Sequence, residues 1–335
     1  MTTDFEKDQS PDVIIDLNDV EVDFPTSTGL FRQSHISAVD KVSLQIRKGE
    51  SVGFVGESGS GKSTIARAIV KLVKPTSGRV LFLGQDIFKQ DAKQRKEYRK
   101  HVQMIFQDPY ESLNPRATIS KIIEEPLIVH HIGQTKEERK GNVRRLLSIV
   151  GLEAELENRF PQELSGGQRQ RVSIARALAV NPDVVIADEP VSMLDVSIRI
   201  GILNLLKDLK KSLNLTFLFI THDLGVARYF CDRIAVIYRG QILEEAQTEE
   251  LISKRRSPYT RLLLDSVPGS NLISETSLEK EDKGAPDELQ TLNEISGCRF
   301  HPRCPNAAED CSKSPPTLVD FGNKHFVACY HPLAQ

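Results

Sequence analysis

Apolar and polar residues alternate in two segments near the start of the chain. The alternation runs through residues 13–24 (VIIDLNDVEVDF) and again through residues 38–46 (AVDKVSLQI). Because the side chains of a strand point alternately to its two faces, both segments predict half-buried strands. Their closeness in the chain favours an antiparallel sheet region.

Short apolar runs with the length of buried strands recur further along the chain. They stand at residues 51–55, 102–107, 184–187, 215–220 and 233–238. Amphipathic segments separate several of them, and the clearest places Ile198, Ile202, Leu205, Leu206 and Leu209 on one helical face. Strands that alternate with helices predict an α/β fold with a mainly parallel sheet, whose sites lie at the carboxyl ends of its strands.

The same pattern divides the chain into parts. Residues 12–268 are expected to form one α/β domain, into which a helical subdomain, at about residues 119–180, is inserted. Residues 269–296 are charged and poor in large apolar side chains, which is typical of a linker. Residues 297–335 follow as a small, separate, cysteine-rich module.

Composition and charge narrow the classes of protein. The chain has 335 residues, of which 39% are hydrophobic and 27% charged, and its formal net charge is −2, so nothing favours nucleic acid or an anionic lipid surface as a partner. The start, MTTDFEKDQS, is acidic and polar, so no signal peptide is expected, and the apolar runs are far shorter than the roughly 20 residues of a membrane helix. We expect a cytosolic protein.

A glycine-rich phosphate loop is the strongest chemical signal. GESGSGKS, residues 56–63, matches the pattern G-x4-G-K-[ST] and stands between a predicted strand and a predicted helix. Glycine lets the backbone wrap around phosphate oxygens, while Lys62 reaches the β- and γ-phosphates and Ser63 ligates Mg²⁺. The expected ATP-binding residues are Phe24, Gly56, Glu57, Ser58, Gly59, Ser60, Gly61, Lys62, Ser63 and Thr64.

An acidic pair ends a later apolar strand. In VVIADE, Asp188 stands at the end of the strand, where it can hold Mg²⁺ through water, and Glu189 is placed to polarise an attacking water. Acidic residues are also favoured at helix N-termini. The position of this pair after a phosphate loop favours the catalytic interpretation.

A third motif, LSGGQRQR at residues 164–171, is similar to the signature sequence of ATP-binding cassette (ABC) ATPases. Its serine and glycines at a helix start would form a second anion site. The resemblance implies the P-loop fold of an ABC nucleotide-binding domain, and two domains that face head to tail and enclose two ATP molecules. The residues expected to contact the ATP of the other subunit are Ser165, Gly166, Gly167 and Gln168.

Further positions match the ABC pattern in order. Gln107, in IFQDP, resembles the loop glutamine that contacts Mg²⁺ and relays to membrane subunits. His222, after FLFIT, resembles the switch histidine that contacts the γ-phosphate, which makes it, with Glu189, an expected catalytic residue. Asp195, in SMLD where the family usually has SALD, resembles the dimer-crossing loop. The adenine-stacking aromatic is expected to be Phe24, with Phe31 and plain core packing as alternatives.

A closer resemblance is to the ATPase subunits of oligopeptide and dipeptide importers. It rests on GESGSGKST, IFQDPYESLNPR, DEPVSMLDVSIR, SPYTRLLLDSVP and GCRFHPRCP, with LNPR most similar to the F-type subunit. It implies a homologous ATPase subunit as the partner in a heterodimer or homodimer, two transmembrane permeases, an extracytoplasmic binding protein, and a place at the cytoplasmic face of the membrane. Importers of nickel chelates or oligosaccharides remain alternatives. A soluble ABC ATPase of DNA repair or translation is a weaker one, because no long heptad segment separates Lys62 from Asp188.

Four of the five cysteines stand in the last 38 positions: Cys298, Cys304, Cys311 and Cys329. A cytosolic chain keeps thiols reduced, and four thiolates can bind zinc or a [4Fe-4S] cluster. The resemblance implies a [4Fe-4S] cluster; zinc, no metal, and a redox-sensing role of this tail stay open. Cys231 is expected to be a small buried apolar residue.

Overall fold

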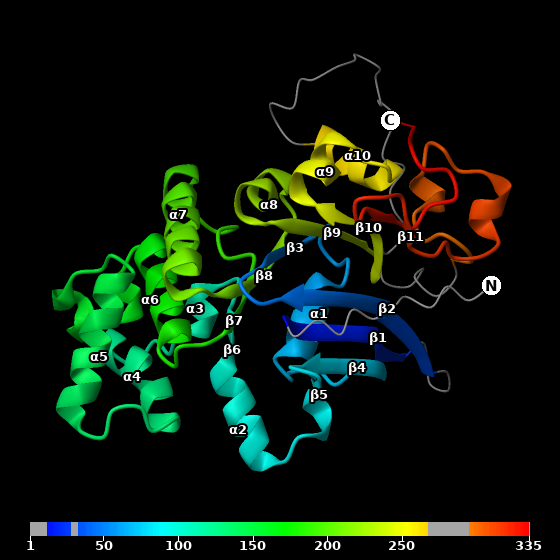
Figure 1. The fold of residues 1–335 in the computed structure, drawn as a ribbon. Helices are drawn as coiled ribbons and strands as arrows, with labels where there is room; N and C mark the ends of the chain where they lie inside the picture. The colour runs from blue at the N-terminus through cyan, green and yellow to red at the C-terminus, as the bar shows by residue number, and fades with distance from the viewer. Residues whose placement is uncertain (1–11, 28–32, 267–294, 335) are drawn as a thin grey trace.

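The computed structural model describes residues 12–27, 33–266 and 295–334. Most of the expected linker, 269–296, and the alternative adenine residue Phe31 lie outside the described residues. Within them, two sheets form the frame of the molecule, with helices packed around them (Figure 1).

The smaller sheet is antiparallel, as expected from the alternation near the start of the chain. Its order is β2-β1-β4-β5. The alternating residues Ile15 and Leu17 are buried on one face, which explains the pattern. The strands are β1 (Val13–Ser27), β2 (Gln33–Arg47), β4 (Ser77–Phe82) and β5 (Gln85–Asp86).

The larger sheet has the order β11-β12-β10-β9-β3-β8-β7-β6 within the described residues. From β9 to β6 its neighbours run parallel, so the expected α/β class is confirmed. The strands are β3 (Ser51–Val55), β6 (Val102–Ile105), β7 (Val184–Asp188), β8 (Thr216–Thr221), β9 (Arg233–Tyr238), β10 (Gln241–Gln247), β11 (Val319–Asp320) and β12 (Phe326–Val327).

The parallel strands separate two hydrophobic cores, because successive side chains point to opposite faces. Phe54 and Ile186 belong to the core shared with the antiparallel sheet, whereas Val55 and Ala187 belong to the core shared with the helical layer. Strands that are buried on both faces lose the alternation and become continuous apolar runs. This is why the sequence shows runs here.

Helices cover the second core and form the inserted subdomain at the left of Figure 1. The helices of the subdomain are α4 (Ile119–Val129), α5 (Lys136–Ile149) and α6 (Gly166–Leu178). The others are α1 (Lys62–Ile69), α2 (Ala92–His101), α3 (Pro109–Ser112), α7 (Val196–Leu213), α8 (Leu224–Phe230), α9 (Thr248–Ser253) and α10 (Pro258–Asp265). Among the described helices, none has both the length and the apolar character to cross a bilayer.

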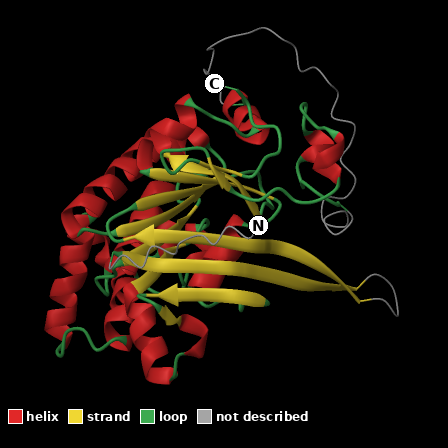
Figure 2. Cartoon of the chain, turned by 45° about the vertical axis from the view of Figure 1, so that its right-hand side comes forward, coloured by secondary structure: helices red, strands yellow, loops and turns green. Residues whose placement is uncertain are grey.

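The cysteine segment is expected to be a separate module, but its hairpin extends the larger sheet. β12 pairs antiparallel with β10, with Val327 opposite Glu244. Glu244 is fully buried and accepts hydrogen bonds from the backbone N–H of Ser257 (3.0 Å) and lies 2.7 Å from Nε2 of buried His325. Figure 1 places the C-terminal segment, in orange and red, next to β10, and Figure 2 shows the strands of both sheets in yellow from another side. Burial of apolar residues such as Val327 stabilises this packing, although the charged linker before the segment predicts a separate module.

Candidate nucleotide site

Residues from four distant segments meet at the carboxyl ends of adjacent parallel strands. The phosphate loop follows β3, His222 follows β8, Asp188 ends β7 with Glu189 directly after it, and Gln107 follows β6. In a parallel sheet these ends share one edge, where α/β proteins bind their ligands. The strand order β3-β8-β7-β6 therefore assembles the expected site from its parts.

The first glycine of the phosphate loop is required by close packing. A methyl group at Gly56 would lie 2.0 Å from the carbonyl oxygen of Ile237, and one at Gly61 would lie 2.3 Å from the carbonyl oxygen of Ala38. Gly61 also has φ +99°, in the left-handed region that glycine favours. The loop thus depends on glycine for its shape as well as for access to phosphate.

Replacing Gly56 with alanine should destabilise the protein by several kcal/mol, because the new methyl group meets backbone that cannot move away cheaply. A fall in the midpoint of thermal unfolding would show this. Gly141→Ala is the matched control: it lies in α5 with open space around it and should stabilise by about 0.5–1 kcal/mol through helix propensity. Equal midpoints for the two variants would contradict the packing argument.

Lys62 lies inside the ring of oxygens that the loop forms. Its Nζ donates to the carbonyl oxygens of Gly56 (2.7 Å) and Glu57 (2.6 Å) and to Oγ of Ser60 (3.2 Å). Burial lowers the pKa of Lys62, while nearby carboxylates act in the opposite direction. At the start of α1, no side chain caps the helix, so its first N–H groups are left for an anion.

Ser63 and Asp188 meet where Mg²⁺ is expected. The hydroxyl of Ser63 donates to Oδ1 of Asp188 at 2.9 Å. Burial raises the pKa of Asp188, with the Ser63 hydrogen bond opposing and Glu189 adding to the effect. A hydroxyl and a carboxylate that converge at the phosphate loop are oxygen donors of the kind Mg²⁺ prefers, so these residues fit the ion.

The carboxylate of Glu189 is the centre of a polar cluster. Its Oε2 accepts from Nε2 of Gln107 at 3.3 Å and lies 3.2 Å from Nδ1 of His222. Glu189 has φ +44°, unusual for a residue with a side chain, and its N–H donates to the carbonyl oxygen of Ile220. The side chain of His222 is 57% exposed against 11% for Glu189, so the histidine faces the open side of the site.

The signature motif lies apart from this cluster. Ser165 caps α6 in a capping box with Gln168, whose side-chain oxygen accepts from the Ser165 N–H at 2.9 Å. A methyl group at Gly167 would lie 2.6 Å from Ile198 of α7, so this glycine also serves packing. Figure 1 places α6 in the helical part and α1 between the sheets. Ser165 and Asp195 are both exposed and accessible to a second subunit.

Phe24 stands on β1 opposite Ile36 and is 42% exposed. This exposure argues against the plain core-packing alternative for Phe24. Its contact with adenine stays a prediction.

Sequence reasoning did not find three residues that hold the phosphate loop and its surroundings. The hydroxyl of Tyr259 accepts from the N–H of Glu57, Arg303 pairs with the carboxylate of Glu57, and Arg299 pairs with Asp40 at 2.6 Å. Tyr259 comes from a segment notable only for its family resemblance, and the two arginines come from the cysteine segment, where the cysteines draw attention instead. No local pattern marks them, because their partners are distant in the chain.

The four C-terminal cysteines line one cavity, together with Phe300. Burial raises the pKa values of Cys298, Cys304 and Cys329, the last to about 11. Thiols in such surroundings are neutral unless a cation is bound. Cys231 is buried elsewhere, against Gly53, as expected for a structural cysteine.

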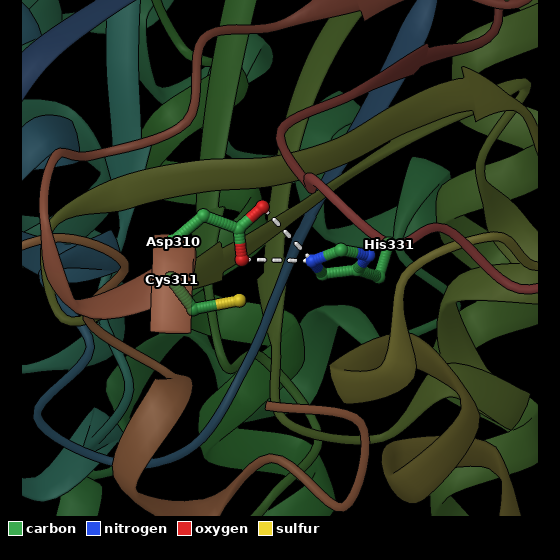
Figure 3. Close-up of side chains that lie close together, drawn as sticks. All are labelled: Asp310, Cys311 and His331. Atoms are coloured by element: carbon green, nitrogen blue, oxygen red, sulfur yellow. Dashed lines mark hydrogen bonds and ion pairs between the residues drawn. The ribbon is translucent and has the colours of Figure 1, made fainter. Parts of the chain in front are cut away.

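A second set of donors stands beside this cavity (Figure 3). Asp310, Cys311 and His331 offer ligand atoms within 4.8 Å of one another. Nε2 of His331 lies 2.8 Å and 3.0 Å from the two carboxylate oxygens of Asp310, and this contact lowers the pKa of Asp310. The tail thus contains an all-thiol set and a mixed set that share Cys311.

The fold and the arrangement of the site define an ATPase of the ATP-binding cassette class. The ABC transporter family model matches residues 39–192, and the model of the oligopeptide/dipeptide transporter C-terminal region matches residues 243–311. The chain belongs to the ATP-binding subunits of oligopeptide/dipeptide ABC transporters.

Individual relatives cover nearly the whole chain. The oligopeptide transport ATP-binding protein AppF of Bacillus subtilis (strain 168) is 46% identical over 323 residues, 95% of this chain and 97% of that protein. The oligopeptide transport ATP-binding protein OppF of Haemophilus influenzae is 43% identical over 96% of this chain and 98% of that protein. A solved dimeric cassette in a post-hydrolysis state with ADP and Pi has a TM-score of 0.63 at 35% identity, and covers 70% of this chain and 99% of that one.

Proposed function

We propose that this subunit hydrolyses ATP to power the import of oligopeptides through partner permeases. The observation that carries this is the convergence of the phosphate loop, Asp188, Glu189, Gln107 and His222 at one sheet edge, in a chain whose relatives are oligopeptide transport ATP-binding proteins. The same site would also serve the import of nickel chelates or oligosaccharides, because substrate choice lies in other subunits.

Each group of residues has its own role in the proposed reaction. The amides of the phosphate loop and Lys62 would hold the polyphosphate, and Ser63, Gln107 and Asp188 would hold Mg²⁺. Bound Mg²⁺ neutralises charge on the β- and γ-phosphates. Glu189 polarises the attacking water, and His222, within reach of its carboxylate, contacts the γ-phosphate side and holds the geometry. The residues expected to complete ATP contacts are Phe24, Ser58, Gly59, Ser60 and Thr64.

Two subunits are needed for a complete site in this proposal. Ser165, Gly166, Gly167 and Gln168 would form, at the start of α6, a second anion site for the ATP of the other subunit. The exposed Asp195 follows Leu194, which a methyl group at Gly166 would meet at 3.5 Å. A homologous ATPase subunit, packed head to tail, would receive this motif at its own ATP. The dimer would then act at the cytoplasmic face of the membrane, held there by two permeases, with an extracytoplasmic binding protein delivering the peptide.

Peptide uptake in cells tests the transport function. A strain that lacks this gene should lose uptake of a labelled oligopeptide, the intact gene should restore it, and the Glu189→Gln gene should not. Labelled nickel and a labelled oligosaccharide serve as the comparison solutes. If the deletion instead abolished uptake of nickel or of the oligosaccharide and left peptide uptake unaffected, the peptide assignment would be overturned and the ATPase assignment would stand.

We further propose that Cys298, Cys304, Cys311 and Cys329 hold a [4Fe-4S] cluster. Support comes from the four thiols lining one cavity, and from the backbone bond that joins two of the segments, the N–H of Cys298 to the carbonyl oxygen of Cys311 at 2.7 Å. Sulfur donors in a largely enclosed site are the usual ligands of such clusters.

Metal analysis of protein purified without oxygen tests this assignment. The full chain should contain iron and sulfide, and Cys329→Ser should lose most of both. Cys231→Ala, which removes a buried thiol away from the cavity, should keep them. Zinc in place of iron, retained by Cys329→Ser but lost in His331→Ala, would instead favour the mixed set of Figure 3.

A further inference from the structure

An arginine of the cysteine segment is bound to the phosphate loop. Nη1 of Arg303 donates to Oε2 of Glu57 at 2.8 Å, and Nη2 donates to Oε1 at 3.0 Å. The two residues are 246 positions apart in the chain. Two parallel bonds of this kind fix the orientation of both side chains, which a single contact between flexible groups does not.

The backbone of Glu57 is also bound by a residue of helix α10. Its N–H donates to the hydroxyl of Tyr259 at 3.1 Å, and Tyr259 is fully buried with its ring 5.2 Å from that of Phe300. The carbonyl oxygen of Glu57 in turn accepts from Nζ of Lys62 at 2.6 Å. One residue thus joins Arg303, through its side chain, to the lysine expected to hold phosphate, through its backbone.

The charge of Glu57 gives this link an electrostatic role. A carboxylate in a loop that receives a polyphosphate repels its ligand, and the repulsion is strongest where solvent is partly excluded. The guanidinium of Arg303, which is charged at any ordinary pH, neutralises the carboxylate through the two hydrogen bonds. Both side chains are about half exposed or less, at 46% and 36%, so salt will weaken the pair.

We propose that Arg303 is a positioning residue for ATP, which acts through Glu57 by neutralising its carboxylate and holding the phosphate loop open to the nucleotide. The proposal rests on the assignment of this loop to ATP. It also gives the cysteine segment a part in nucleotide binding, because Arg303 lies in the short helix His301–Arg303, between Cys298 and Cys304.

Steady-state ATP hydrolysis by the full-length chain tests the proposal. Arg303→Ala should raise KM for MgATP about threefold to tenfold and leave kcat within about twofold, since a partly exposed charge pair is lost and the catalytic groups are untouched. Arg303→Lys keeps the charge and should recover part of the loss. The increase in KM should shrink when the salt concentration is raised.

A double variant separates electrostatics from simple scaffolding. In a Glu57→Gln background there is no carboxylate to neutralise, so adding Arg303→Ala should change KM little. Lys313→Ala is the matched control, because Lys313 is an exposed cation of the same segment whose partner is Glu309. It should leave KM unchanged. If Arg303→Ala fails to fold by circular dichroism, Arg303→Gln and Arg303→Lys provide the same comparison.

Two results would overturn the proposal. One is an unchanged KM in Arg303→Ala. The other is that Arg303→Ala raises KM by the same factor in the wild-type chain and in the Glu57→Gln background, which would indicate that Arg303 only supports the structure. Failure of the wild-type chain to bind MgATP, or to hydrolyse it together with its partner ATPase subunit, would instead overturn the proposed function, so the two failures are distinguishable.

Discussion

Glu189→Gln should lower kcat for ATP hydrolysis about 100-fold to 10,000-fold, the usual contribution of a positioned general base. The amide keeps the size of the side chain and can still meet Gln107 and His222, but it cannot take a proton from water. ATP binding should persist, so the variant should accumulate as an ATP-bound dimer. Single-turnover hydrolysis and gel filtration with MgATP measure the two effects.

Glu249→Gln is the matched control for this variant. It removes one carboxylate from an exposed ion pair with Arg228 on the surface and should leave both kcat and dimer formation unchanged. A Glu189→Gln variant with wild-type turnover would exclude Glu189 as the group that activates water.

Asp188→Asn should have opposite effects on stability and function. Burial raises the pKa of Asp188, so the folded state holds a proton on this group more tightly than the unfolded state does. At neutral pH the buried carboxylate therefore lowers the stability. This cost shrinks as the pH falls through the raised pKa of Asp188 in the folded state, and it is gone below the pKa of Asp188 in the unfolded state. Asparagine removes the charge and keeps an acceptor for the Ser63 hydroxyl, so the ligand-free variant should unfold at a higher temperature than wild type.

The same substitution removes a ligand of Mg²⁺. Hydrolysis should fall at least about 100-fold, and MgATP should no longer raise the unfolding temperature, because stabilisation by a ligand follows its affinity for the folded state. Thermal unfolding without MgATP, at pH 7 and pH 5, measures the stability difference between the variant and wild type. Thermal unfolding with MgATP measures the loss of binding. A ligand-free variant less stable than wild type at pH 7 would contradict the assigned cost of burial.

The sequence predicts the central strands and the phosphate loop well, because their signals are local. Strands β3, β7 and β8 are apolar runs that both cores bury, and the loop is a contiguous motif between a strand and a helix. Helix ends are less clear: the apolar pattern after Lys62 continues to Val73, but α1 ends at Ile69 and Lys71 takes φ +62°. The helix closes in a left-handed turn, in which the N–H of Leu72 donates to the carbonyl oxygen of Arg67 at 2.8 Å, and no glycine marks this turn in the sequence.

Partners across the chain could not be predicted from single segments. Nothing near Glu57 indicates Arg303, and nothing near Glu244 indicates His325, since each pair depends on how distant strands come together. Only the order in which the ABC motifs follow one another along the chain predicts that Gln107, Glu189 and His222 lie close together. The reason is topological: the strand order β3-β8-β7-β6 differs from the order of the strands along the chain.

The pairing of β12 with β10 also bears on how the protein is made. Without residues 295–334, β10 would lose the strand that pairs with it at Glu244 and Glu245, and open edges of a sheet recruit strands from other chains. Synthesis runs from the N-terminus, so the edge of β10 stays open until the last strands have been translated. We therefore expect chains that end before this hairpin to aggregate more readily than the full chain.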